Sequence, residues 1–210
     1  MESQFFSCSS CGSNFASQLS DPVYILCKQC GAVLLNKVER NSTALDKIPP
    51  DWSFIHVGTS LEVEKKQLNV CGRVRLQLRN EYKNFWCCAH RDGTHLWLME
   101  SFGSLAIMRP QWLPFDDGTK QLRAGGTLKL PDITLYGEYI EKCERISVEG
   151  EVQGWNLFSP DFFLVQMANN NRDIFVFAIK SKKEVLGLRG RKAEPEELKL
   201  KNIQAWDEWK

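Results

Sequence analysis

The chain has 210 residues, of which 43% are hydrophobic, and its 27 basic and 26 acidic side chains give a formal net charge of +1. This composition is typical of a globular protein and excludes disorder of the whole chain. A charge so close to neutral excludes a global attraction to nucleic acid or anionic lipid, so such binding would need a local patch. No apolar run approaches the roughly 20 residues that span a bilayer. Residues 1–6 lack the basic and apolar regions of a secretory signal. We therefore expect a soluble, cytoplasmic protein.

Four of the eight cysteines lie close together near the N-terminus, as two Cys-x2-Cys pairs separated by fifteen residues: Cys8, Cys11, Cys27 and Cys30. Two residues between thiolates allow one tight turn to present both sulfurs to a metal ion at about 2.3 Å each. A glycine follows each pair and can adopt the positive φ that turns backbone N–H groups toward the sulfurs. This spacing predicts a zinc ribbon over residues 1–36, with a short β-hairpin between the two pairs.

The four thiolates also determine what kind of metal site to expect. They fill every corner of a tetrahedral zinc site, which predicts one structural Zn²⁺ ion and no open position for water. A disulfide framework is disfavoured because no export signal is visible, and a redox centre needs only one such pair in a βαβ context. Iron in a rubredoxin-like site stays an alternative, because four thiolates bind iron as well. The other cysteines, in β-like segments, are predicted to be buried small hydrophobic residues: Cys71, Cys87, Cys88 and Cys143.

Beyond the ribbon the pattern is that of a β protein. Residues 37–50 form a polar linker that ends in two prolines, which exclude a helix there. Between residues 51 and 180, short apolar or alternating runs separated by turn residues predict a β-sandwich or barrel-like domain. The clearest predicted strands are Leu68–Leu78, Tyr82–Ala89, Leu96–Met99, Arg145–Val152, Phe162–Met167 and Ile174–Ile179. Residues 181–210 form a basic and then acidic C-terminal segment that closes on this domain, with Leu198–Lys201 alternating like a final strand.

One predicted hairpin carries a candidate second site. Asp92-Gly93 is a two-residue turn signal between two strand-like arms. With these two residues as the loop, Cys88, His90 and His95 share one face. They could then bind a second metal or form a Cys–His pair, although ordinary surface histidines are the simpler interpretation.

The β-domain also shows signs of an internal duplication. Gly58-Thr59 precedes the strand Val70–Val74, and Gly126-Thr127 precedes the strand Ser147–Val152. An aromatic-rich hairpin follows each block. We interpret the pattern as two related β-modules within one domain.

Several of these motifs occur in the same order in a known family. They are the Cys-x-x-Cys-Gly ribbon, Gly58-Thr59, Gly72-Arg73-Val74, Trp97–Glu100, Val148–Glu151 and Glu196–Leu200. Together they resemble the bacterial domain-of-unknown-function family 4178 with its N-terminal zinc ribbon. The resemblance covers most of the chain. It implies no defined reaction or catalytic residue, and it suggests a scaffold or adaptor in an assembly associated with membrane stress.

Three function classes remain. A non-enzymatic interaction protein with a zinc-stabilised ribbon and a protein partner fits the near-neutral charge and the absence of P-loop, dinucleotide and hydrolase motifs. Nucleic-acid binding is the alternative; the ribbon is acidic, so binding would depend on the basic stretch Lys180–Lys192. An enzyme would depend on the Cys88, His90 and His95 face. We expect the first class, no nucleic-acid partner, and contact with a membrane only at its periphery or through a partner.

Overall fold

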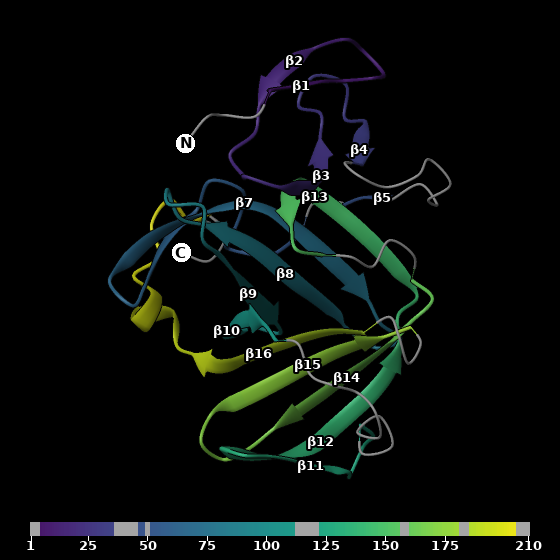
Figure 1. Cartoon of the computed structure of the whole chain (residues 1–210), viewed down its shortest axis with the longest axis vertical. Coiled ribbons are helices and arrows are strands. Elements are labelled where there is room, and N and C mark those ends of the chain that lie inside the picture. Colours follow the sequence, from purple (N-terminus) through teal and green to yellow (C-terminus); the bar gives the residue numbers. More distant parts are fainter. Residues whose placement is uncertain are drawn as a thin grey trace.

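The computed structural model describes residues 5–35, 46–48, 51–111, 122–155, 160–180 and 185–204. These residues form a mainly antiparallel β protein, which confirms the predicted fold class (Figure 1). Their strands belong to one 14-stranded sheet and one 2-stranded sheet. A single turn of 3₁₀-helix, η2 (Pro195–Leu198), lies near the C-terminal end of the described chain.

The N-terminal ribbon, at the top of Figure 1, consists of two short hairpins. In the first, β1 (Phe5–Ser7) pairs with β2 (Asn14–Ala16), and in the second, β3 (Pro22–Leu26) pairs with β4 (Val33–Leu35). Each hairpin encloses one cysteine pair. The prediction of a hairpin between the two cysteine pairs is therefore wrong. The strand β3 pairs with β4 and with β13 of the main sheet, and not with β2.

Two meanders build the main sheet. The first contains β6 (Ser60–Val63), β7 (Lys66–Gln77), β8 (Tyr82–Ala89), β9 (His95–Ser101) and β10 (Ser104–Pro110). The second contains β11 (Thr127–Leu130), β12 (Ile133–Lys142), β14 (Phe163–Ala168), β15 (Asp173–Ile179) and β16 (Val185–Ala193). Between β12 and β14, the chain forms β13 (Arg145–Gln153), which crosses to the first meander and pairs with β7. All six predicted strands are present, with ends that agree to within two residues.

The described part of the predicted linker also takes part in this sheet. Its strand β5 (Asp46–Lys47) pairs in parallel with β13. Because β3 pairs with the same strand, β13 joins the ribbon, the linker and the first meander.

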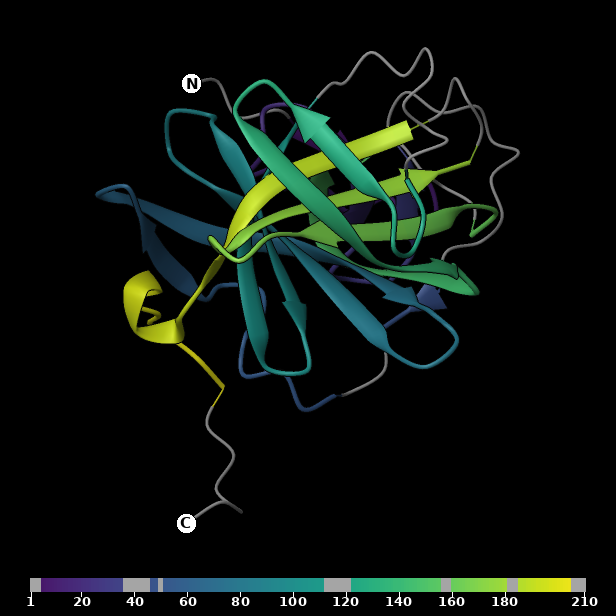
Figure 2. The same ribbon diagram turned by 90° about the horizontal axis from the view of Figure 1, so that it is seen from below.

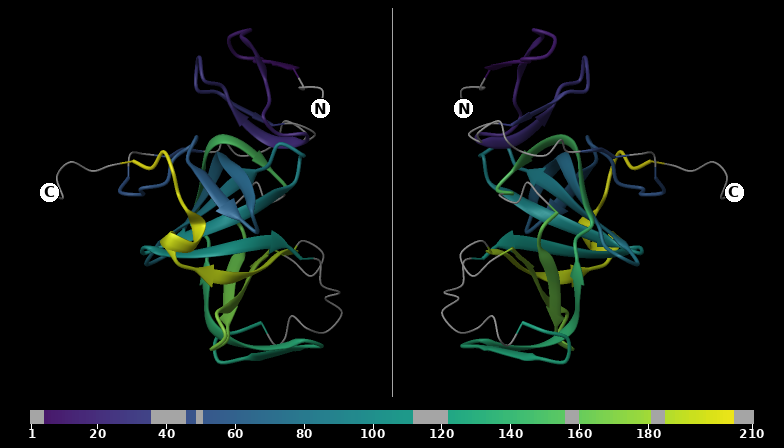
Figure 3. Two further views of the ribbon diagram at one scale, coloured as in Figure 1. Left: turned by 90° about the vertical axis from the view of Figure 1, so that its left-hand side faces the viewer. Right: turned by 90° about the vertical axis from the view of Figure 1, so that its right-hand side faces the viewer.

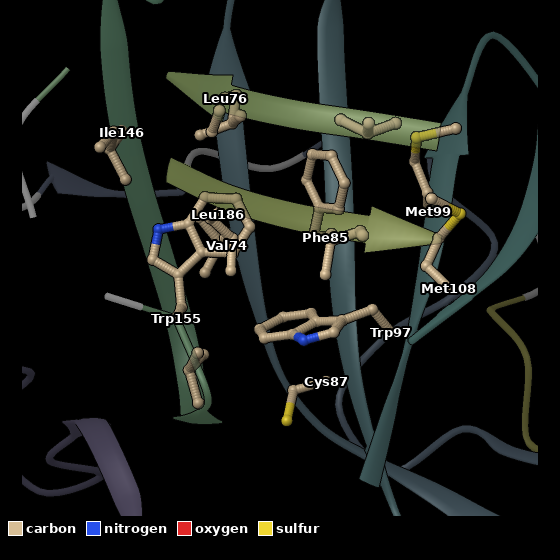
Figure 4. Close-up of a cluster of buried hydrophobic side chains, with 14 of the residues drawn as sticks. Val74, Leu76, Phe85, Cys87, Trp97, Met99, Met108, Ile146, Trp155 and Leu186 are labelled. Atoms are coloured by element: carbon tan, nitrogen blue, oxygen red, sulfur yellow. The ribbon is translucent and has the colours of Figure 1, made fainter. Parts of the chain in front are cut away.

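The two meanders meet where β10 pairs with β16, and the two halves of the sheet then pack face to face (Figures 2 and 3). The space between them is filled by one large apolar core. Figure 4 shows its centre, where the Trp155 ring lies 5.3 Å from Phe85 and 5.6 Å from Trp97 between ring centroids. Contacts of this kind between aromatic rings add to the free energy gained by burying their area.

The outer faces of both halves are covered as well. On the first meander, Trp86, Cys88 and Leu98 pack beneath Ile55 and other apolar residues of a second cluster. A third cluster forms on the outer face of the second meander, around Phe175 and Phe177. Burial on both faces explains why these strands read as continuous apolar runs instead of alternating ones.

The two meanders repeat the same topology, which supports the interpretation of two related modules. In each, a hairpin leads into three further antiparallel strands, and the long strand of the hairpin has a register shift at a glycine, Gly72 or Gly137. A Cβ at Gly72 would lie 2.3 Å from a backbone oxygen, and one at Gly137 would lie 2.0 Å from another. Glycine is therefore required at both positions. The counterpart of Val70–Val74 thus lies in β12, and β13, which contains Ser147–Val152, is an added strand.

Matching ion pairs mark the same symmetry. Arg109 of β10 lies directly opposite Arg189 of β16 in the sheet. Each arginine pairs with an acid in the hairpin turn of its own meander, Arg109 with Glu64 and Arg189 with Asp132.

The C-terminal residues differ from the sequence prediction. Leu198 ends the 3₁₀-helix and buries its side chain in the second cluster, so it does not begin a strand. The chain returns to the sheet at Lys201, which makes an isolated bridge to Ser60. Pro195 at the start of η2 fixes φ for a helical turn, and this local preference outweighs the alternating pattern that follows it.

Candidate metal centre

Each cysteine pair lies in a turn with the same backbone hydrogen bonds. The Gly12 N–H donates to the Cys8 carbonyl over 2.8 Å, and the Gly31 N–H donates to the Cys27 carbonyl over 2.7 Å. The two glycines have φ of +74° and +69°, which is the left-handed region that favours glycine. The positive φ predicted for the glycine after each pair is therefore confirmed.

The two turns bring the four sulfurs together. The Sγ atoms of Cys8 and Cys30 lie 3.6 Å apart, and those of Cys11 and Cys27 lie 3.8 Å apart. All four ligand atoms lie within 4.8 Å of one another. In a tetrahedron with metal–sulfur bonds of about 2.3 Å, neighbouring sulfurs are roughly 3.8 Å apart. The four cysteines therefore form a group of the size and chemistry that can hold one metal ion.

Ser13 is a polar neighbour of this group that the sequence analysis did not single out. Its Oγ lies 3.2 Å from the Cys11 Sγ and 3.3 Å from the Cys27 Sγ. This hydroxyl, followed by backbone N–H groups of Cys30 and Gln29, lowers the pKa of Cys27 to about 6, and Ser13 also lowers the pKa of Cys11. Its place two residues after Cys11, just beyond the turn glycine, is the sequence signal that could have identified it.

The pKa of Cys30 shifts in the opposite direction from those of Cys11 and Cys27. The N–H of Ala32 favours the Cys30 thiolate, but the other cysteines and burial outweigh it and raise the pKa of Cys30 to about 11. Four sulfurs so close together cannot all ionise without a cation between them. A bound divalent ion would deprotonate all four, because its charge favours every thiolate.

The exposure of the ligands is uneven. Cys8 and Cys27 are buried, whereas Cys11 and Cys30 are exposed. With four thiolates as ligands, a tetrahedral ion has no remaining position for water or substrate. The donor set therefore fits a structural ion.

The ribbon is joined to the main sheet next to this group. Three residues of β3 pair with β13, as Ile25 with Glu151, Tyr24 with Val152 and Pro22 with Gln153. Tyr24 is fully buried and, together with Leu19, belongs to the large central core. Cys27 directly follows β3 in the chain, so an ion held by Cys27 would also hold the end of that strand.

A buried carboxylate strengthens this junction. Glu151 Oε2 accepts hydrogen bonds from the Ser17 hydroxyl at 2.7 Å and from the Gln18 N–H at 2.8 Å. The Glu151 residue is only 5% exposed, so these bonds replace water that the carboxylate has lost. Ribbon and main sheet therefore share backbone pairing, an apolar core and a buried polar contact.

The candidate second site does not assemble. The β8–β9 hairpin pairs Ala89 with His95 and Cys88 with Leu96, one residue away from the predicted register. The loop is longer than two residues, because the His90 N–H donates to the Thr94 carbonyl and Gly93 has a φ of +88°. A shift of one residue moves a side chain to the opposite face of the sheet.

The three side chains of that site consequently lie in different surroundings. Cys88 is buried in the second cluster beside Trp86. His95 faces the other way, and its Nδ1 lies 3.2 Å from the Gln153 Nε2. His90 lies at the turn, with its Nδ1 3.0 Å from Asp92.

The four cysteines outside the ribbon are all buried, as predicted. Burial raises the pKa of Cys71 to about 11 and that of Cys87 and Cys143 to about 12, and it also raises the pKa of Cys88. These thiols are therefore protonated near neutral pH and have little nucleophilic character.

The described basic residues of Lys180–Lys192 do not form an uncompensated patch. Arg189 pairs with Asp132, and Arg191 pairs with Glu197 over 2.7 Å. Lys192 lies 3.9 Å from Glu138. Both arginines belong to β16, an interior strand, and residues 181–184 lie outside the described chain. Pairing with acids reduces the positive field that phosphate binding requires.

Comparison with family models, with curated proteins and with solved structures gives no match for this chain. Within the described residues, no helix has the length and apolar content needed to cross a membrane.

Proposed function

We propose that this chain is a non-enzymatic interaction protein in which one structural zinc ion completes the N-terminal ribbon. The observation that carries the proposal is the group formed by the Cys8, Cys11, Cys27 and Cys30 sulfurs, all within 4.8 Å of one another. Four thiolates leave a tetrahedral zinc ion no position for a reacting water. The ion would then stabilise structure, and the protein would act through the surfaces that this structure presents.

The attachment of the ribbon supports a structural ion. A ribbon of about 30 residues buries too little surface to be stable by itself. Here β3 adds its own side chains to the central core. Loss of the ion would therefore also destabilise the part of the core that lies outside the ribbon. Zinc bound to cysteines of a small module commonly supplies its folding free energy.

A protein partner is the second part of the proposal. The described surface exposes several large apolar side chains on the first meander and beside it, among them Trp52, Tyr82 and Phe102. Exposed aromatic residues are enriched in protein interfaces. The resemblance to the domain-of-unknown-function family 4178 suggests that the partner belongs to a bacterial assembly associated with membrane stress, in which this protein is a scaffold or adaptor.

The test begins with bound metal. Elemental mass spectrometry of protein purified without a metal-affinity tag should find one zinc per chain, and Cys8→Ser and Cys27→Ser should lose it. Cys143→Ser is the matched control, because Cys143 is a buried cysteine outside the group, and it should keep the zinc. Iron in place of zinc would correct the identity of the ion, and metal-free protein with a folded ribbon would contradict the structural ion.

The interaction part needs a separate measurement. Crosslinking of the full chain in its native cell, followed by mass spectrometry, should recover the same partner with wild type and Cys143→Ser. Recovery should fall with Cys27→Ser. A chain that stays monomeric and crosslinks to nothing would contradict the proposed interaction, whatever the metal content.

A further inference from the structure

Each exposed sulfur of the ribbon contacts a buried sulfur from the other hairpin. Cys11 lies in the turn between β1 and β2 and is exposed, whereas Cys27, directly after β3, is buried. Their Sγ atoms lie 3.8 Å apart. The exposed Cys30 and the buried Cys8 make the second contact of this kind, at 3.6 Å. Both contacts therefore run between the two hairpins, and neither joins the two cysteines of one Cys-x2-Cys pair.

Ser13 places a hydroxyl against both sulfurs of the Cys11–Cys27 contact. Its Oγ lies 3.2 Å from the Cys11 Sγ and 3.3 Å from the Cys27 Sγ. A hydroxyl group can donate a hydrogen bond to a thiolate. With an ion bound, both sulfurs are thiolates, and the thiolate is the form of cysteine that oxidants attack. The contact thus holds two sulfurs in one small polar site.

The position of the ribbon allows a small oxidant to reach Cys11. The ribbon projects from the main sheet at the top of Figure 1, and the Cys11 side chain is exposed on it. The four cysteines outside the ribbon are all buried. Redox-sensitive cysteines are typically solvent-accessible thiolates with a second cysteine close enough to form a disulfide. Cys11 meets these conditions together with Cys27.

We propose that Cys11 is an oxidation site for small peroxides and that Cys27 converts the oxidised Cys11 into a disulfide. This inference rests on the proposed zinc site, because the same thiolates would hold the ion. Oxidation would remove two of the four ligands, and Cys8 and Cys30 alone do not complete a tetrahedron around zinc. The ribbon would then release its ion in response to peroxide.

The reaction balances with hydrogen peroxide as the oxidant. The Cys11 thiolate attacks one peroxide oxygen, the O–O bond breaks, and the sulfur becomes a sulfenic acid while hydroxide leaves. The Cys27 thiolate then attacks the Cys11 sulfur, the S–S bond forms, the S–O bond breaks, and a second hydroxide leaves. Each hydroxide takes a proton from solvent. Two thiolates, one peroxide and two protons therefore give one disulfide and two waters, and two electrons pass from sulfur to oxygen.

The disulfide would join the same two hairpins that the ion joins. Sulfurs in a disulfide are about 2.05 Å apart, so the two Sγ atoms must approach by about 1.8 Å from their present 3.8 Å. The bond would tie the β1–β2 turn to the end of β3, which pairs with β13. We therefore expect β3 to stay on the main sheet in the oxidised, zinc-free protein. Cys71, which lies against Gln18 of the ribbon, should then stay buried.

The experiment treats the full chain with hydrogen peroxide, both zinc-loaded and metal-free, after its metal content has been measured. A chromophoric indicator follows zinc release, and mass spectrometry of non-reduced peptides identifies the disulfides. Cleavage at Asp21 and Lys28 puts Cys27 on a peptide of its own, and fragment ions then distinguish Cys8 from Cys11. We expect release of one zinc per chain, a Cys11–Cys27 disulfide as the first to form, and reversal by dithiothreitol with added zinc.

Cys143→Ser is the matched control, since Cys143 is a buried cysteine outside the group, and it should release zinc at the wild-type rate. A first disulfide within either Cys-x2-Cys pair would overturn the proposed pairing. Thiols that stay reduced at a peroxide concentration that oxidises free cysteine would overturn the oxidation site and leave the zinc site standing. A chain that binds no zinc would contradict the proposed function, and a Cys11–Cys27 disulfide in that chain would still support the oxidation site. Maleimide labelling of Cys71 after oxidation would overturn the retention of β3.

Discussion

The two ends of the central core are closed in different ways. At one end the ribbon contributes Leu19 and Tyr24, which are apolar or aromatic and buried, and the chain that follows them leads into the cysteine group. At the other end the closing residues are Lys83, Ser101 and Gln166, and a cavity remains. One end therefore depends for its burial on the ribbon that carries the cysteine group, whereas the other end retains a buried ion pair, which is a weak source of stability.

The largest expected effect follows loss of the metal at the ribbon end. Removal of the ion with a chelator, or Cys27→Ser, should unfold the ribbon and uncover the part of the core beneath β3. Cys71, which is 3% exposed and lies against Gln18, should then react with a maleimide, whereas Cys143 at the far side should stay protected. Mass spectrometry of labelled peptides distinguishes the two thiols. Equal protection of Cys71 with and without metal would show that β3 stays in place by itself.

A substitution within β3 should have the next largest effect. Tyr24→Ala removes a fully buried aromatic ring from the shared core and should lower the free energy of unfolding by about 3–5 kcal/mol. Phe5→Ala is the matched control, because this ring is 79% exposed at the outer end of the ribbon, and it should change stability little. Urea denaturation measures both variants. A similar small loss in both would mean that the ribbon contributes nothing to the core.

At the polar end, the effect should depend on whether one or both charges are removed. Glu81→Ala leaves Lys83 buried without its closest carboxylate and should cost about 3 kcal/mol. Replacing both residues, Glu81→Leu with Lys83→Met, should restore most of that loss. Thermal unfolding at pH 7 measures the difference. A double variant less stable than Glu81→Ala would show that the pair itself stabilises the fold.

How far the sequence predicts each region depends on how local the deciding interactions are. The cysteine group was predictable because both turns and their glycines are local. The strands were predictable because apolar runs and turn residues mark them. The pairing of β3 with β13 was not, since it joins Ile25 to Glu151 across most of the chain. Lys83 gave no signal either, because a lysine in a strand is usually exposed and only the partner strands show that it points inward.

The β8–β9 hairpin shows a further reason why the sequence does not predict every feature of the structure. Asp92-Gly93 predicts a turn, and the turn is present, but the loop includes one more residue than expected. Asp92 Oδ1 accepts the Thr94 N–H at 2.8 Å, a side-chain contact that helps fix the longer loop. Because strand periodicity is two, this one residue separates Cys88 from His95 and removes the candidate second site.

The smallest expected effect is a pH dependence where this hairpin meets the ribbon end. Burial lowers the pKa of His95 below its ordinary value. The Gln153 side chain beside it accepts a hydrogen bond from the N–H of Asp21, the residue just before β3. A histidine with a lowered folded pKa binds fewer protons in the folded state than in the unfolded state. Its contribution to folding stability is therefore fully present when the pH is above the pKa of the unfolded state, about 6.5. That contribution is lost as the pH falls toward the pKa of the folded state. Stability should therefore decrease as the pH falls below about 7, and His95→Gln should make that decrease shallower. The slope of unfolding free energy against pH measures this, and an identical slope in both proteins would assign the decrease to other groups.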